Sequence, residues 1–218
     1  MISYTEENYL KAIYHLSNGG EQSVTTNELA EAMQTKAASV TDMAKKLAAK
    51  SLVAYERYYG LKITTTGRQQ ALQIIRKHRL WETFLVEKLG FTWDEVHEVA
   101  EQLEHIQSTQ LINKLDVFLG HPKSDPHGDP IPDASGKLKP QALVGLDQLM
   151  AGKRGTIVTV KDSDAELLKY LDKIGARPGK TIQVLRREAF DKSMEVLIDK
   201  KKKVFISQDV SRNILLAT

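Results

Sequence analysis

A chain of 218 residues with 41% hydrophobic and 27% charged residues has room for two or three folded domains and the composition of a soluble globular protein. It contains no run of about 18 apolar residues that could span a membrane and no cysteine for a disulfide framework or thiolate metal cluster, and we expect no secretion signal. The net charge of +3 is uneven, since residues 1–80 carry +4, residues 81–120 carry −6 and residues 153–218 carry +6. The basic N-terminal block favours a polyanionic partner, and we expect a cytoplasmic protein without a membrane partner.

The first part of the chain predicts a winged helix-turn-helix. Apolar residues at helical spacing predict helices over 5–17, 28–33 and 37–50, with a short turn between the last two. Alternating apolar and polar residues over 52–64, around a glycine-containing turn, predict the hairpin that forms the wing.

Three further helices follow the wing. The pattern predicts a long helix over 66–89, ended by Gly90, and shorter helices over 92–108 and 110–119. Five of the six prolines then fall within residues 121–145, which indicates an irregular connector at a domain boundary.

Short β-rich runs dominate the last third of the chain and predict a small SH3-like barrel, interrupted by one helix over 164–173. The fold class is therefore mainly α with a β-rich C-terminal domain. The strands are expected over 155–160, 181–185, 194–198 and 204–207. We expect a winged helix-turn-helix over 1–73, a helical metal-binding and dimerisation domain over 74–145, and the barrel over 146–218.

The helix over 37–50 would read DNA. Its open face carries hydroxyls and a carboxylate that can contact base edges, and lysines that supply salt-dependent phosphate contacts. An ordinary three-helix bundle with a solvated lysine face is the alternative. The candidate DNA-binding residues are Lys36, Ala38, Ser39, Thr41, Asp42, Lys45 and Lys46 on the helix, and Arg57 and Lys62 on the wing.

A set of histidines and glutamates predicts a metal site. His97, Glu101, Glu104 and His105 fall at i, i+4, i+7 and i+8, one stripe of the helix over 92–108, and His78 with Glu82 forms an i, i+4 pair on the preceding helix. Imidazoles and carboxylates suit Mn²⁺, Fe²⁺, Co²⁺ or Zn²⁺, and the absence of cysteine favours Mn²⁺ or Fe²⁺.

Two other interpretations compete with a metal sensor. A charged stripe is often only a solvated face. The start of the stripe, His97-Glu98, also resembles a zinc-protease helix, but Glu101 replaces the second histidine and no distinct nucleophile motif is present. A metalloenzyme and a small-molecule substrate are therefore not expected.

The chain resembles the metal-dependent repressors typified by the diphtheria toxin repressor and the manganese transport regulator. The resemblance rests on residues 7–14, 30–53, 61–68, 76–82, 104–105 and 126–132, and on a C-terminal part, residues 152–217, similar to the family's SH3-like FeoA-type domain. It implies a homodimer formed through the helices after the wing, in which each winged domain reads half of an inverted-repeat DNA operator.

The resemblance also implies ligand sets. His78, Glu82 and His97 look like the family's ancillary site, and Glu101, Glu104 and His105 like its primary site; Glu101 stands where manganese-type members carry Glu, which implies manganese-like selectivity. The first helix departs from the pattern, with Asn8 and Lys11. Lys11 cannot ligate a cation while it is charged, but it could neutralise part of the carboxylate cluster. The further candidate ligands are Asn8, which can ligate through its amide oxygen, Asp125, and either Asp164 or Glu166 from the C-terminal domain.

These departures leave a second function open. A winged-helix regulator whose metal site has decayed would bind DNA independently of metal. The first expectation is a repressor of manganese or iron homeostasis that binds its operator when Mn²⁺ or Fe²⁺ is bound, with Zn²⁺ or Co²⁺ as substitutes in vitro.

Overall fold

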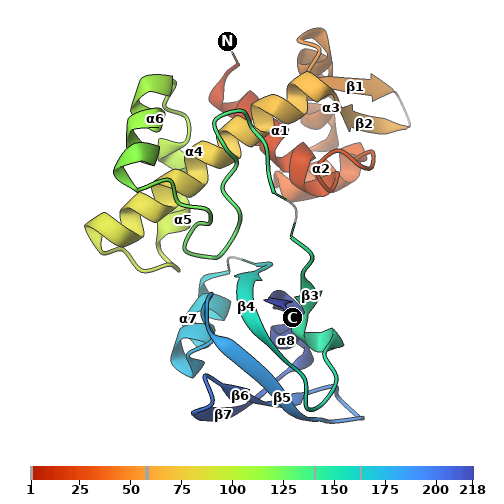
Figure 1. The fold of residues 1–218 in the computed structure, drawn as a ribbon. Coiled ribbons are helices and arrows are strands. Elements are labelled where there is room, and N and C mark those ends of the chain that lie inside the picture. Colours follow the sequence, from red (N-terminus) through yellow and green to blue (C-terminus); the bar gives the residue numbers. More distant parts are fainter. Residues whose placement is uncertain (1, 57–58, 140, 163) are drawn as a thin grey trace. The chain divides into compact units, whose positions relative to one another are not determined.

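The computed structural model describes residues 2–56, 59–139, 141–162 and 164–218 (Figure 1). The chain divides into two compact units, and helix α4 (Thr65–Leu89) runs from the first into the second. Among the described residues, no helix has the length and apolarity needed to cross a membrane. The first unit comprises Met1–His78, Leu103–Ser108 and Pro132–Lys137, and the second Arg79–Gln102, Thr109–Ile131 and Leu138–Thr218.

The first unit contains the predicted winged helix-turn-helix. A capping box starts its first helix, because the Ser3 hydroxyl accepts from the Glu6 amide and the Glu6 carboxylate accepts from the Ser3 amide. Leu10, Val40 and Leu61 are fully buried in one core shared by helices and hairpin. The elements are α1 (Tyr4–Leu16), α2 (Thr26–Ala32), α3 (Ala37–Ala49) and the antiparallel strands β1 (Val53–Glu56) and β2 (Gly60–Ile63).

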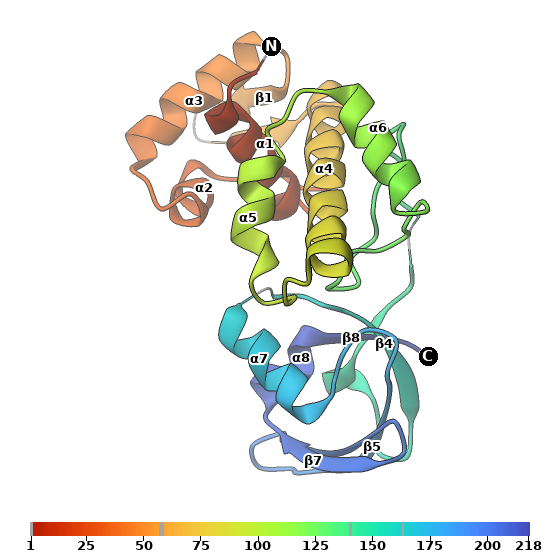
Figure 2. The same cartoon turned by 90° about the vertical axis from the view of Figure 1, so that its left-hand side faces the viewer.

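In the second unit, α5 (Val96–Leu103) and α6 (Thr109–Phe118) flank the later turns of α4 (Figure 2). The predicted helix over 92–108 was too long at both ends. Residues 92–95 form a turn in which the Glu95 carboxylate accepts from the amide and hydroxyl of Thr92. At the other end, Glu104 and His105 leave the helix and make buried ion pairs, so the single stripe of four ligands predicted for this helix is wrong.

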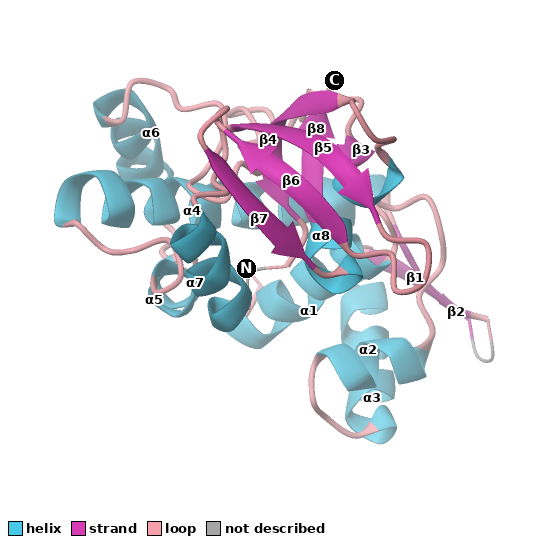
Figure 3. Cartoon of the chain, turned by 90° about the horizontal axis from the view of Figure 1, so that it is seen from below, coloured by secondary structure: helices cyan, strands magenta, loops and turns pink. Residues whose placement is uncertain are grey.

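The C-terminal part of the second unit is an antiparallel sheet in the order β3-β8-β4-β5-β6-β7 (Figure 3). Its inner face packs against apolar residues of α7, including Leu168 and Leu171. The four predicted strands and the predicted helix are confirmed, whereas β3, η1, α8 and β8 were not predicted. The elements are β3 (Val144–Gly145), η1 (Leu146–Gln148), β4 (Arg154–Val160), α7 (Ala165–Ile174), β5 (Thr181–Arg187), β6 (Met194–Ile198), β7 (Lys202–Ile206), α8 (Gln208–Asn213) and β8 (Ile214–Ala217).

Candidate metal centre and DNA-binding surface

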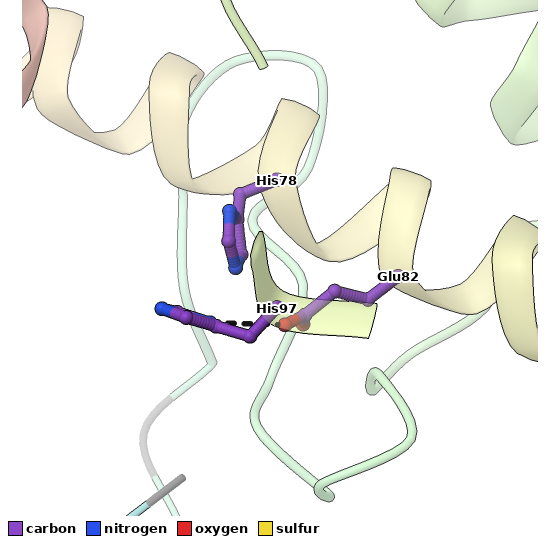
Figure 4. Close-up of side chains that lie close together, drawn as sticks. All are labelled: His78, Glu82 and His97. Carbon is purple, nitrogen blue, oxygen red and sulfur yellow. Dashed lines mark ion pairs between the residues drawn. The ribbon is translucent and has the colours of Figure 1, made fainter. Parts of the chain in front are cut away.

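Helices α4 and α5 bring Glu82 and His97 together. The Glu82 carboxylate is buried, and its Oε1 lies 3.4 Å from Nδ1 of the partly exposed His97. Figure 4 shows His78 and Glu82 on successive turns of α4 and His97 on α5. The i, i+4 spacing of His78 and Glu82 within one helix places both side chains on the same face of α4.

The connector adds a second imidazole and a second carboxylate. Nδ1 of His127 lies 3.6 Å from Oε2 of Glu82, and ligand atoms of Glu82, Asp125 and His127 all lie within 4.8 Å of one another. All three residues are buried. Nε2 of His127 is 2.7 Å from the carbonyl oxygen of Trp93, to which it donates. This bond directs the other ring nitrogen, Nδ1, toward Glu82.

The local backbone explains how the connector holds these groups. Oδ1 of Asp125 accepts from the amides of His127 and Asp129, at 2.9 and 3.0 Å, which closes a tight turn. Oδ2 of Asp125 lies 3.4 Å from Nε of Arg79 on α4. Gly128 sits in this turn with φ +91°, and a Cβ there would lie 1.7 Å from the carbonyl oxygen of Val158 on β4. The turn therefore requires glycine at this position.

Burial and charge shift the pKa values in this cluster. Burial, together with the negative charges of Glu82 and Asp129, raises the pKa of Asp125 to about 7. Burial lowers the pKa of His127, but its hydrogen bond and charge interaction with Glu82 outweigh that effect and raise it to about 9. The buried carboxyl groups of Glu82 and Asp125 and the imidazole of His127 thus place oxygen and nitrogen donors close enough together to hold a divalent cation. The donor set fits Mn²⁺ or Fe²⁺.

Glu104 and His105 form a separate cluster in the first unit. The fully buried Glu104 carboxylate accepts from Nζ of Lys11 at 2.7 and 2.8 Å and lies 2.6 Å from Nδ1 of His78. Burial raises the Glu104 pKa, but the hydrogen bond from His78 and the positive charge of Lys11 outweigh it, so the net pKa is lowered. His105 Nδ1 lies 2.5 Å from the carboxylate of Glu7. Lys11 neutralises a carboxylate here, as expected for this position.

The other predicted ligands are not among the described donor groups whose ligand atoms lie within 4.8 Å of one another. Glu101 is exposed on α5, with Oε1 3.7 Å from Nε2 of His97. Asp164 caps α7 by accepting from the amides of Glu166 and Leu167, and Glu166 pairs with Lys169 at 3.0 Å. The Oδ1 atom of Asn8 is buried and has no hydrogen-bond partner within the described part of the chain.

Two residues of these clusters, His127 and Glu7, were not among the predicted ligands. His127 lies in the loop 126–132 that carries part of the family resemblance, and a histidine two residues after Asp125 in a proline-rich turn is a usable signal for a ligand. Glu7 is the residue before the predicted ligand Asn8. Its carboxylate contacts His105, the Gln107 amide and, at 3.6 Å, Lys77. No sequence pattern links these positions, which come from three separate segments.

Helix α3 exposes most of the predicted DNA-binding face. Its opposite side, with Val40, Ala44 and Leu47, is buried. Thr41 is half-buried and donates through Oγ1 to the carbonyl oxygen of Ala37. Arg57 lies outside the described residues. The exposed positions are Lys36, Ala38, Ser39, Asp42, Lys45 and Lys46 on or next to α3, and Lys62 on β2.

Three family models match the chain. They describe the N-terminal DNA-binding domain of iron-dependent repressors, over residues 1–61, the metal-binding and dimerisation domain of the same repressors, over residues 64–133, and a FeoA domain, over residues 144–218.

Individual relatives agree with these matches. The iron-dependent repressor IdeR of Mycobacterium leprae is 31% identical over 195 residues, which cover 83% of each chain. A solved structure of a manganese-dependent transcriptional repressor in complex with manganese is 35% identical, with a TM-score of 0.89 over 98% of this chain and 99% of the other. The structure of ScaR with bound Cd²⁺ is 34% identical, with a TM-score of 0.80 over 98% and 99%.

Proposed function

The chain belongs to the iron-dependent repressor family and is a metal-dependent, DNA-binding transcriptional repressor, and we propose that a divalent cation held by Glu82, Asp125 and His127 controls its DNA binding. The observation that carries this proposal is the convergence of three buried donor groups within 4.8 Å. His97, whose Nδ1 lies 3.4 Å from Glu82, and His78, one turn earlier on α4, complete the proposed ligand set.

Mn²⁺ or Fe²⁺ is the proposed ligand. The donors are oxygen and nitrogen atoms, and the chain has no cysteine that would favour a softer ion. When bound, the cation supplies a fixed positive charge that holds the carboxylates and imidazoles in one arrangement. The protein side of the centre is prepared for it, because Trp93 orients the His127 ring and Arg79 holds Asp125.

The DNA partner is proposed to be an inverted repeat bound by a homodimer. Each protomer would place α3 in the major groove of one half-site, with the wing residue Lys62 near the backbone and half-site centres about 34 Å apart. Metal and DNA must then raise each other's affinity, because binding linkage is reciprocal. Lys36, Ser39 and Lys46 are the exposed residues expected to contribute most to DNA contacts.

The test has two steps. Selection from a random duplex pool with Mn²⁺ present should recover an inverted repeat, and fluorescence anisotropy on that duplex should show tight binding with Mn²⁺ and weak binding with a chelator. The His127→Ala protein should bind the duplex weakly both with Mn²⁺ and with the chelator. The exposed His121, paired with Asp116, offers a matched control, so His121→Ala should behave as the unmodified protein. Equal affinity with Mn²⁺ and with chelator would contradict metal control.

A further inference from the structure

Lys11 forms an ion pair with the carboxylate of Glu104, a residue that the family resemblance implies to be a metal ligand. Nζ of Lys11 contacts both oxygens of Glu104, and the two side chains are 15% and 0% exposed. His78 contacts Oε2 of the same carboxylate at 2.6 Å. An ammonium that donates to both oxygens already satisfies the charge and much of the hydrogen-bonding capacity of a buried carboxylate.

The neighbouring groups offer little to a second cation. Asn8 contributes a neutral amide oxygen, a weaker ligand than a carboxylate for hard cations. The carboxylate of Glu7 is engaged by His105, Gln107 and Lys77. A divalent cation placed at Glu104 would also be repelled by the Lys11 ammonium. The residues of this cluster therefore do not fit a metal ion.

We propose that Lys11 is a built-in substitute for a cation at Glu104, so that each chain binds a single regulatory cation, at the centre formed by Glu82, Asp125 and His127. This inference rests on the proposed function for the identity of that centre. Lys11 also fastens α1 to the segment 103–108 without metal. Leu10 of α1 lies in the same core as Val40 of α3. The Lys11–Glu104 ion pair therefore keeps α1, and with it α3, attached to the segment 103–108 when metal is absent.

Metal stoichiometry distinguishes this arrangement from a two-cation protein. Equilibrium dialysis of the full chain against Mn²⁺ should give one equivalent of bound Mn²⁺ per chain. The His127→Ala protein should bind none. Introducing Lys11→Glu into the His127→Ala protein should restore one equivalent, because a second carboxylate then replaces the ammonium beside Glu104. Adding Glu104→Gln should remove that equivalent again.

Two further variants keep the test decisive. Lys11→Gln removes the positive charge without adding a negative one, and it should also allow a cation to bind at Glu104. It replaces Lys11→Glu in the test if that variant fails to fold. Lys153→Glu makes the same charge change at an exposed lysine in the C-terminal part, and should leave the His127→Ala protein without bound metal.

The results separate this inference from the proposed function. If the His127→Ala protein retains an equivalent that Glu104→Gln removes, Lys11 does not substitute for a cation. If neither Lys11 variant gains an equivalent in that background, the inference also fails. If the unmodified protein binds no Mn²⁺ while Lys11→Glu gains an equivalent that depends on Glu104, the proposed centre is wrong and the role of Lys11 stands.

Discussion

Oε2 of Glu82 on α4 and Nδ1 of His127 in the connector lie 3.6 Å apart and are both buried. Glu82→Gln keeps the shape of the side chain but removes the charge that a cation requires. We expect its Mn²⁺ affinity to fall by at least about tenfold, the lower end of the loss seen when even indirect metal contacts are removed. Isothermal titration calorimetry measures the change. Glu87→Gln, an exposed residue on the same helix, should leave the affinity unchanged, and equal losses in both variants would contradict the assignment.

Gly128 lies where the connector turn meets β4, and a Cβ there would approach the Val158 carbonyl oxygen to 1.7 Å. Gly128→Ala should therefore unfold more easily than Gly152→Ala, which has a similar positive φ, +83° against +91°, but open space around it. Both variants place a side chain at a positive φ. The difference between their free energies of unfolding, about 1–3 kcal/mol, therefore reports the steric clash alone. Urea unfolding followed by circular dichroism measures it. Indistinguishable midpoints would show that the turn does not pack on β4 as described.

Lys46 is exposed on α3 and should contact phosphate. Lys46→Ala should weaken binding to specific and unrelated duplexes by similar factors, and should reduce the slope of log K against log salt by about 1. Anisotropy titrations over a series of salt concentrations measure this slope. Lys153→Ala, at an exposed lysine in the C-terminal part, provides the comparison and should retain the full slope. A sequence-dependent loss in the Lys46 variant would instead indicate base contact.

Glu6 links the start of α1 to Lys50 at the end of α3, with Oε2 2.7 Å from Nζ. The hydrogen bond from Lys50 lowers the pKa of Glu6 below its usual value of 4.5. A carboxyl with a depressed folded-state pKa stabilises the protein above its unfolded-state pKa, and this contribution is lost as pH falls through the folded-state value.

Glu6→Gln should therefore destabilise the protein at pH 7 by about 0.5–1 kcal/mol, a modest value because Lys50 is partly exposed. Glutamine can still serve in the capping box, so the loss reports mainly the charge. The difference from the unmodified protein should shrink when unfolding is measured well below pH 4.5. Glu31→Gln, at an exposed position of α2, should have little effect at either pH. A pH-independent difference for Glu6→Gln would assign the loss to packing rather than charge.

The C-terminal end of α5 differs from what helical spacing predicts. The spacing of His97, Glu101, Glu104 and His105 satisfies helical periodicity, yet α5 ends at Leu103. Glu104 and His105 instead pair with Lys11 and Glu7, which lie more than ninety positions earlier in the chain. Periodicity describes neighbours within one helix and contains no information about such distant ion pairs.

By itself, the sequence determined the order and type of most elements, the winged helix-turn-helix and the β-rich C-terminal part, because local apolar spacing and turn residues specify them. It also identified Glu82 and His97 as candidate ligands. Only the tertiary structure decided which donors meet. In the folded chain His127 and Asp125 lie beside Glu82, and Glu104 forms an ion pair with Lys11. Local spacing does not predict these contacts, because a charged group is buried only with partners that the folded chain supplies.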